Sequence, residues 1–271
     1  MNDPSPSARP QDTWARGAAY EPYMGRWSRL VAHTFLDWLG VAPTSRWLDV
    51  GCGTGALTQT VLEIAAPAHV TGIDRSDGYI SYAQAHVQDP RARFEVGDAQ
   101  ALSEQTASYD VAISGLMLNF LPQPEQAVRE MARVVRSDGI VAAYVWDYAG
   151  KMQLMLHFWN AAVALDPDAF DLDEGRRFPL CQPSPLTELF RRADLTQVEV
   201  RAIDIATDFQ NFDDYWSPFL GGQGPAPSYV MALSDERRTA LRERIWAGLP
   251  FALNGSIPLI ARAWAVRGRR Q

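Results

Sequence analysis

Residues 46–58, RWLDVGCGTGALT, contain three glycines at alternate positions, Gly51, Gly53 and Gly55, and Asp49 lies two residues before the first of them. The segment RWLDV is short and apolar, which indicates a buried strand, and the residues after Gly55 begin a helical pattern. Glycine at a turn from strand to helix permits a positive φ and removes the Cβ that would block a ligand. The stretch therefore predicts a turn on which a ligand packs, with a carboxylate beside it.

Short apolar runs alternate with helical patterns along most of the chain. The expected strands are residues 46–50, 69–74, 93–98, 109–114, 139–146, 197–205 and 259–266. The expected helices are residues 25–39, 56–65, 77–87, 124–135, 185–192 and 234–246. Regular alternation of strands and helices predicts an α/β fold with a largely parallel sheet.

Two long segments, residues 147–183 and 207–253, interrupt this alternation. Ligands of open α/β sheets bind beyond the carboxyl ends of the strands, and both segments leave from or return near that edge. We expect them to be lid segments. Residues 1–19 are rich in Pro and Ser and predict a disordered tail, which leaves residues 20–271 as a single domain.

Acidic residues end the two strands that follow the glycine turn. Asp74 lies about 20 residues beyond the glycines, where a carboxylate can accept hydrogen bonds from both hydroxyls of a ribose. Asp98 ends the next strand, where a carboxylate suits the exocyclic amine of an adenine. The glycines match a dinucleotide fingerprint only loosely, and together with the three aspartates they predict a nucleoside that carries no pyrophosphate.

Composition excludes several classes of protein. The 271 residues carry a net charge of −7, so a general field for nucleic acid is absent. The two cysteines, Cys52 and Cys181, form no C-x-x-C pair and no disulfide framework. The acidic run 166–174 lacks the glycine and glutamate placement of a calcium loop, so we expect no metal. No signal peptide or membrane span is indicated, which predicts a cytoplasmic protein.

The motifs LDVGCGTG, GIDRS and VGDAQAL, and the segment from Tyr109 to Val141, resemble those of the class I S-adenosylmethionine-dependent methyltransferases over residues 47–146. The resemblance is to the small-molecule group that includes the ubiquinone and menaquinone enzymes. It implies a Rossmann-like seven-stranded sheet in the order 3-2-1-4-5-7-6, with strand 7 antiparallel and helices on both faces. It also implies S-adenosylmethionine as cofactor. The implied contacts to that cofactor fall on Asp49, Gly51, Gly53, Gly55, Asp74, Arg75, Asp98, Ala99, Ser114 and Leu116.

The segment YEPYMGRWSRL, residues 20–30, resembles a helix that closes over the cofactor in a subset of these enzymes. It makes Tyr20, Tyr23, Arg26 and Trp27 candidates to cover the methionine end. Arg26 can match the cofactor carboxylate bidentately. The alternative is that Trp27 belongs to the core and Arg26 is solvated.

Methyl transfer needs little catalytic machinery, because alignment of the acceptor with the activated methyl and exclusion of water supply most of the rate. The candidates for a general base are His157, Asp147, Tyr148 and Asp166. Seven aromatic residues in or directly before the interrupting segments suit either an aromatic or lipid-like acceptor or the core of a lid: Trp146, Phe158, Trp159, Phe212, Tyr215, Trp216 and Phe219.

The sequence thus predicts a methyltransferase that acts on oxygen, nitrogen or carbon of a small molecule. A nicotinamide-dependent oxidoreductase is disfavoured by Asp98 and the late strand at 259–266. A catalytically silent cofactor-binding protein and a protein methyltransferase stay open, as does the oligomeric state.

Overall fold

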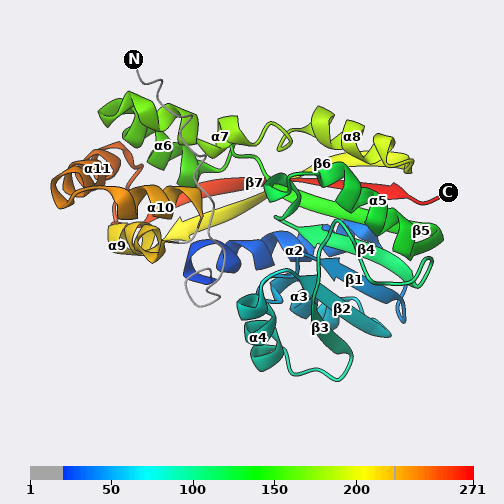
Figure 1. Ribbon diagram of the computed structural model, residues 1–271. Helices are drawn as coiled ribbons and strands as arrows, with labels where there is room; N and C mark the ends of the chain where they lie inside the picture. Colours follow the sequence, from blue (N-terminus) through cyan, green and yellow to red (C-terminus); the bar gives the residue numbers. More distant parts are fainter. Residues whose placement is uncertain (1–20, 223) are drawn as a thin grey trace, which may run out of the picture.

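The computed structural model describes residues 21–222 and 224–271 of the chain (Figure 1). Within them, seven strands form one sheet in the order β3-β2-β1-β4-β5-β7-β6. The strands are β1 (Arg46–Val50), β2 (His69–Asp74), β3 (Ala92–Val96), β4 (Tyr109–Gly115), β5 (Val135–Trp146), β6 (Thr196–Phe209) and β7 (Ile257–Arg269). Strand β7 runs antiparallel to β5 and β6, and the pairs from β3 to β5 are parallel. The predicted fold and strand order are confirmed.

The central strands are largely apolar because both of their faces are covered. In β5, all residues from Gly139 to Trp146 are buried, and in β1 only Arg46 is partly exposed. Strand β6 lies at the edge of the sheet, and its second half alternates between buried and exposed positions. The buried middle of the sheet holds the glycine turn after β1 in a fixed position.

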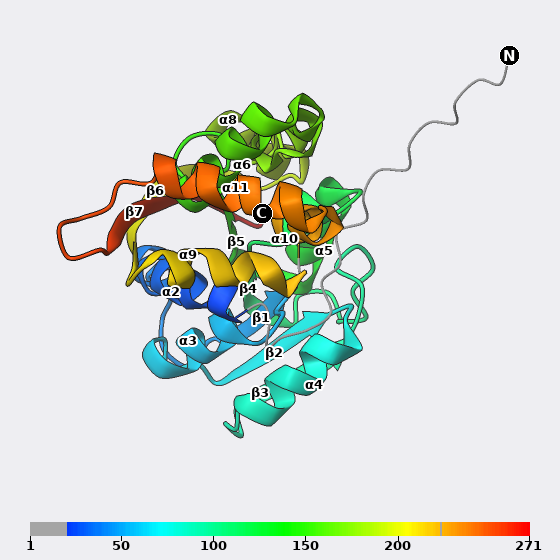
Figure 2. The same cartoon turned by 90° about the vertical axis from the view of Figure 1, so that its left-hand side faces the viewer.

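Helices surround the sheet (Figures 1 and 2). They are α2 (Arg26–Leu39), α3 (Ala56–Ile64), α4 (Asp77–His86), α5 (Pro124–Val134) and α8 (Pro183–Arg192), close to the predicted bounds. Helix α2 packs on α3, and α5 packs on α8. A π-helical turn, η1 (Glu21–Gly25), leads into α2, and a 3-10 turn, η2 (Leu118–Phe120), follows β4. The predicted tail and Tyr20 lie outside the described residues.

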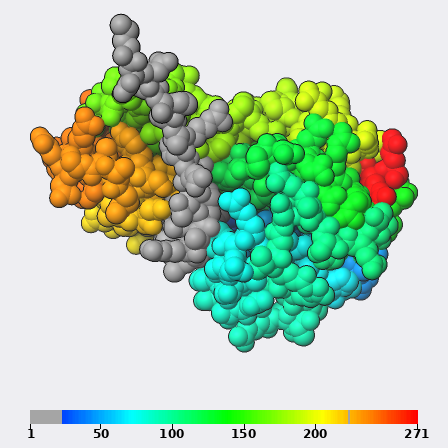
Figure 3. All heavy atoms as spheres, viewed as in Figure 1, coloured from blue at the N-terminus to red at the C-terminus, as the bar shows by residue number. Residues whose placement is uncertain are grey.

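The two interrupting segments fold together into a unit that we call the cap, residues 147–183 and 210–253. The first contains α6 (Gln153–Leu165), η3 (Pro167–Leu172) and α7 (Glu174–Arg177). The second contains α9 (Phe212–Trp216), η4 (Ser217–Gly221), α10 (Pro225–Ala232) and α11 (Asp235–Gly248). Helices α10 and α11 both pack on α6, and their residues form one end of the molecule (Figures 2 and 3). Residues 147–183 are therefore largely helical rather than irregular, and residues 207–209 belong to β6.

Aromatic side chains make the core of the cap. Phe158 stacks on Phe219 with ring centroids 4.6 Å apart, and Trp216 lies 6.1 Å from the same ring. The hydroxyl of Tyr215 donates a hydrogen bond of 2.8 Å to the backbone oxygen of Leu154. All four aromatic residues are buried. These contacts satisfy the side chains within the protein, so they serve as core rather than as an acceptor pocket.

Candidate functional site

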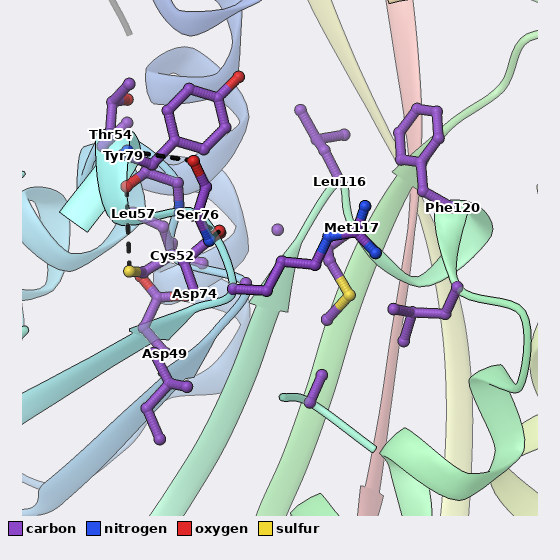
Figure 4. A pocket seen from close by; sticks show the side chains of 18 of the residues that line it. Asp49, Cys52, Thr54, Leu57, Asp74, Ser76, Tyr79, Leu116, Met117 and Phe120 are labelled. Carbon is purple, nitrogen blue, oxygen red and sulfur yellow. Dashed lines mark hydrogen bonds between the residues drawn. The ribbon is translucent and has the colours of Figure 1, made fainter. Parts of the chain in front are cut away.

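A cavity of about 880 Å³ lies at the carboxyl ends of β1 to β5 (Figure 4). The loops after β1, β2 and β3 form one side of it, and the ends of β4 and β5 form the other. Of the predicted cofactor contacts, Asp49, Gly51, Gly53, Asp74, Arg75, Asp98, Ala99 and Leu116 line this cavity. The topology thus brings to one place residues that are spread over 68 positions of sequence, from 49 to 116.

The three glycines of the turn share one backbone feature, but Gly53 and Gly55 have different surroundings. All have positive φ, at 73° for Gly51, 53° for Gly53 and 84° for Gly55. A Cβ on Gly53 would meet nothing within 4 Å, and this residue lines the cavity. A Cβ on Gly55 would press on Val87, Ala83 and Phe94, between 3.1 and 3.3 Å away. Gly53 therefore leaves room for a ligand, whereas Gly55 does not line the cavity and allows close packing of the turn.

Asp49 is fully buried on the wall of the cavity. The hydroxyl of Thr58 donates a hydrogen bond of 2.7 Å to Oδ2, and Oδ1 has no partner among the described residues. Burial raises the pKa of this carboxyl from 3.8 to about 7, against the lowering effect of the Thr58 hydrogen bond. A cationic group in the cavity would supply the missing partner.

Asp74 joins the turn after β1 to the start of α4. Its Oδ2 accepts a hydrogen bond from the backbone N–H of Gly53 at 3.0 Å, and its Oδ1 accepts one from the N–H of Ser76 at 2.9 Å. Burial raises the pKa of this carboxyl, and the two backbone hydrogen bonds oppose the rise. The carboxylate is held at the cavity wall with lone pairs left for a ligand.

The loops after β3 and β4 complete the expected contacts, with one correction. Asp98 lines the cavity and accepts a hydrogen bond of 2.9 Å from the backbone N–H of Gln100. Leu116 lines it with φ at 60°. Ser114, however, is fully buried within β4 and does not line the cavity. Its neighbour Gly115 takes that place, because side chains alternate along a strand.

The N-terminal segment faces the cavity with residues other than those expected. Met24 and Ser28, four positions apart and hence on one helical face, line the cavity. Tyr23, Arg26 and Trp27 do not. Arg26 forms an ion pair of 2.8 Å with Asp214 of the cap. The register of this helix directs Tyr23 and Arg26 toward the cap and packs Trp27 against Phe209 of β6.

Arg26 is also held by aromatic rings, since its guanidinium lies 4.3 Å from the ring centre of Trp27 and 4.9 Å from that of Phe209. Tyr23 donates a hydrogen bond of 3.3 Å to Sδ of Met155 and lies 5.7 Å from the ring of Phe219. These residues fasten the helix to the cap and leave Ser28 beside the cavity.

Only one of the four candidates for a general base lines the cavity, namely Tyr148. Asp147 is buried and accepts a hydrogen bond of 3.0 Å from the backbone N–H of Gly150. Asp166 caps η3 by accepting from the N–H of Asp168 at 3.2 Å. His157 lies on α6 away from the cavity, and burial lowers its pKa. The other three candidates therefore lie outside the cavity.

Sequence reasoning did not find several residues of the opposite wall, including Met117, Phe120 and Tyr144. These residues form no motif of recognisable spacing. The signal that could have found them is their position, just after β4 or near the end of β5. In the described residues, no group of three or more His, Cys, Asp or Glu side chains is arranged to hold a metal ion. No helix there is both long and apolar enough to span a membrane.

Comparison with known proteins shows that the chain is similar to methyltransferases. Residues 48–143 match a family model described as a methyltransferase domain. The chain is 29% identical over 161 residues to malonyl-[acyl-carrier protein] O-methyltransferase of Acetivibrio thermocellus, a match over 59% of this chain and 56% of the relative. It is 33% identical over 135 residues to 2-methyl-6-phytyl-1,4-hydroquinone methyltransferase of Synechocystis, which covers 48% of this chain and 42% of that one. The chain thus spans about half the length of these curated relatives.

Solved structures share the fold at low identity. Phosphoethanolamine N-methyltransferase 2 of Haemonchus contortus, in complex with S-adenosyl-L-methionine, has a TM-score of 0.59 at 14% identity, over 94% of this chain and 57% of that one. The [4+2]-cyclase SpnF has a TM-score of 0.53 at 19% identity, over 91% and 81%. The predicted resemblance to methyltransferases is thus confirmed over residues 48–143, whereas the shared fold alone fixes neither a cofactor nor a reaction.

Proposed function

We propose, from the premise that residues 48–143 match a methyltransferase domain, that this protein methylates a small molecule with S-adenosylmethionine as the methyl donor. The observation that carries the proposal is the cavity wall on which Asp49, Asp74 and Asp98 lie beside the open position at Gly53. Bound S-adenosylmethionine would supply an activated methyl group on a sulfonium. The chain's own residues then have only to bind, orient and exclude water.

The residues of this wall fit such a cofactor in its separate parts. The free Oδ1 of buried Asp49 can accept from the ammonium of the methionine part. Asp74 can accept from ribose hydroxyls, and Asp98 can accept from the adenine amine, with Ala99 beside it. Together these groups would direct the methyl toward the wall formed by the ends of β4 and β5.

Charge on the cavity wall argues against a nicotinamide dinucleotide. Among the described residues, Arg75 is the one cationic side chain on the wall, against three carboxylates. A pyrophosphate would face repulsion there, whereas a sulfonium and an ammonium would be attracted. The wall thus supports the methyltransferase over the oxidoreductase.

We further propose that the acceptor binds next to Tyr148 and the ends of β4 and β5, and that the cap covers it. The acceptor atom is oxygen, nitrogen or carbon, and the malonyl and hydroquinone relatives named above favour none of these for this chain.

Calorimetry tests the cofactor. S-adenosylmethionine and S-adenosylhomocysteine should bind in the micromolar range, about −8 kcal/mol, with no comparable binding of NAD. Tight binding of NAD and none of the sulfonium would overturn the proposal. Incubation of a metabolite extract with methyl-labelled cofactor, followed by mass spectrometry, should then yield a labelled product. Cofactor binding without any product would support the silent binding protein.

A further inference from the structure

The wall of the cavity is divided chemically. Its charged residues among the described ones, Asp49, Asp74, Arg75 and Asp98, all come from β1 and β2 or from the loops after β2 and β3. The ends of β4 and β5 and the loops after them contribute no charged side chain. We call their part the apolar wall: Leu116, Met117, Phe120, Tyr144, Trp146 and Tyr148. Figure 4 shows Leu116, Met117 and Phe120 across the cavity from Asp49 and Asp74.

Trp146 carries the one side-chain N–H group of this wall. It is the last residue of β5 and is 1% exposed, and its Nε1 has no hydrogen-bond partner among the described residues. An indole N–H can only donate, and a buried donor without an acceptor is unfavourable. Trp27, Trp47 and Trp264 also have buried Nε1 atoms without partners, but none of these three lines the cavity. Of these four tryptophans, Trp146 is the one that lines the cavity, which makes it the candidate to meet an acceptor from a ligand.

Neighbouring polar groups already have protein partners. The hydroxyls of Tyr144 and Ser28 share a hydrogen bond of 3.1 Å. Asp147, the next residue after Trp146, does not line the cavity, and its Oδ1 accepts from the backbone N–H of Gly150. A charged ligand at the apolar wall would therefore lose its hydration without gaining a counter-charge.

One aromatic side chain of the cap, Phe178, packs against the rings of the apolar wall. Phe178 lies 4.9 Å from Phe120 and 5.7 Å from Tyr148, between ring centres. The rings of Phe120 and Tyr148 on the wall are flat and rigid, which favours stacking or edge contacts with another ring.

We propose that the apolar wall binds a neutral aromatic methyl acceptor, one of whose oxygens accepts a hydrogen bond from Nε1 of Trp146. The inference rests on the proposed function and narrows its acceptor. A hydrogen bond from Trp146 to the atom that is methylated would occupy the lone pair which must attack the methyl group. The oxygen that accepts from Trp146 is therefore a second atom of the acceptor, different from the one that is methylated. Trp146 is thus a residue for specificity and orientation.

Three small phenols that differ at one position test the inference. 4-Hydroxyacetophenone is neutral and carries an accepting carbonyl, 4-ethylphenol lacks the carbonyl, and 4-hydroxybenzoate replaces it with a charge. Each is titrated into the protein saturated with S-adenosylhomocysteine, with the indole N–H signals of the nine tryptophans followed by NMR after ¹⁵N labelling. The signal lost in Trp146→Phe identifies Trp146. 4-Hydroxyacetophenone should shift this signal and bind most tightly, and 4-hydroxybenzoate should bind at least about tenfold more weakly.

Two variants separate recognition from packing. Trp146→Phe keeps a ring and removes the donor, so it should weaken 4-hydroxyacetophenone roughly five- to tenfold and leave 4-ethylphenol unchanged. Trp47→Phe is the matched control, because Trp47 is equally buried, has an unpartnered Nε1 and does not line the cavity. It should change neither affinity, and both variants should bind S-adenosylhomocysteine as the wild type does.

The results distinguish the two levels of the proposal. Failure of the wild type to bind S-adenosylhomocysteine would overturn the proposed function and this inference with it. Normal cofactor binding combined with a preference for 4-hydroxybenzoate, with no binding of any of the three phenols, or with an equal loss for both neutral phenols in Trp146→Phe would overturn this inference alone.

Discussion

The hydroxyl of Thr58 donates a hydrogen bond of 2.7 Å to one oxygen of the Asp49 carboxyl, while the other oxygen, equally buried, has no partner in the described part of the chain. The carboxyl lies on the cavity wall, and burial raises its pKa to about 7. Near neutral pH, such a group exists in both protonation states.

Cofactor binding should therefore depend on pH around 7. A cation that contacts Asp49 favours the carboxylate, so binding lowers the pKa and releases a proton. Affinity for S-adenosylmethionine should then fall as the pH drops below about 7, approaching about tenfold per unit. Calorimetry between pH 5.5 and 8.5 measures this, with Asp49→Asn as the control that should bind weakly and lose the dependence. A flat profile in the wild type would remove Asp49 from the cation site.

Asp74→Ala should weaken cofactor binding by about 1.5–3 kcal/mol, one to two decades in affinity, because a charge-assisted hydrogen bond is lost. The same carboxylate holds the N–H groups of Gly53 and Ser76, so part of the loss comes from the turn itself. Asp74→Asn keeps one acceptor oxygen and should lose less. An unchanged dissociation constant in folded Asp74→Ala would exclude Asp74 from the ribose site.

Arg26→Ala should reduce stability without changing cofactor affinity. The guanidinium pairs with Asp214 and packs on Trp27 and Phe209, and the two charged side chains are 31% and 26% exposed. At this exposure the pair and its ring contacts contribute about 1 kcal/mol. Chemical denaturation of Arg26→Ala, Asp214→Ala and the double variant should reveal the coupling. A tenfold loss of S-adenosylmethionine affinity at unchanged stability would instead place Arg26 at the cofactor.

Trp216→Ala and Phe219→Ala should each cost about 3–5 kcal/mol of stability, because both side chains are buried in the core of the cap. Whatever activity remains should fall in parallel for all acceptors. The melting temperature and the turnover of several acceptors are measured together. A selective change for one acceptor, with normal melting, would show that these side chains reach the pocket.

Stability at high pH should depend on Glu174, a buried residue of the cap. Its Oε2 accepts a hydrogen bond from Nε1 of Trp159, and burial raises its pKa from 4.5 to about 8. The folded state thus favours the protonated form, so this contribution to stability is complete below about pH 4.5 and is lost as the pH rises through 8.

Glu174→Gln stays neutral and retains an acceptor for Trp159. It should melt near the wild-type temperature at about pH 4.5, where both carry a neutral side chain, and several degrees higher at pH 9. Asp171→Asn, a change at an exposed position of the same segment, serves as the comparison and should show no such gain. An equal difference between Glu174→Gln and the wild type at both pH values would contradict a raised pKa in the folded protein.

Much of the fold could be predicted because its signals are local. The alternation of strands and helices, the glycines at a strand-to-helix turn and the acids at strand ends each depend on a few adjacent residues. Parallel topology then brings the ends of β1, β2 and β3 to one edge, so that Asp49, Asp74 and Asp98 share one cavity.

The N-terminal helix α2 shows what local sequence signals do not determine. The spacing of its apolar residues predicts a helix over residues 25–39, and helix α2 is present at Arg26–Leu39. Periodicity does not say which of two surfaces a given side chain meets, because the cavity and the cap lie against adjacent faces of the same helix. Met24 and Ser28 face the cavity, whereas Arg26 pairs with Asp214, a residue 188 positions away.

The sequence by itself determined the sheet, the glycine turn and the three strand-end carboxylates, because each follows from local periodicity and backbone sterics. Tertiary structure alone decided which aromatic residues form the cap core and which one, Trp146, lines the cavity with an unpaired donor. The physical reason is that burial and hydrogen-bond satisfaction depend on contacts between segments far apart in the chain. Identical residue types therefore become core or site according to what the fold places against them.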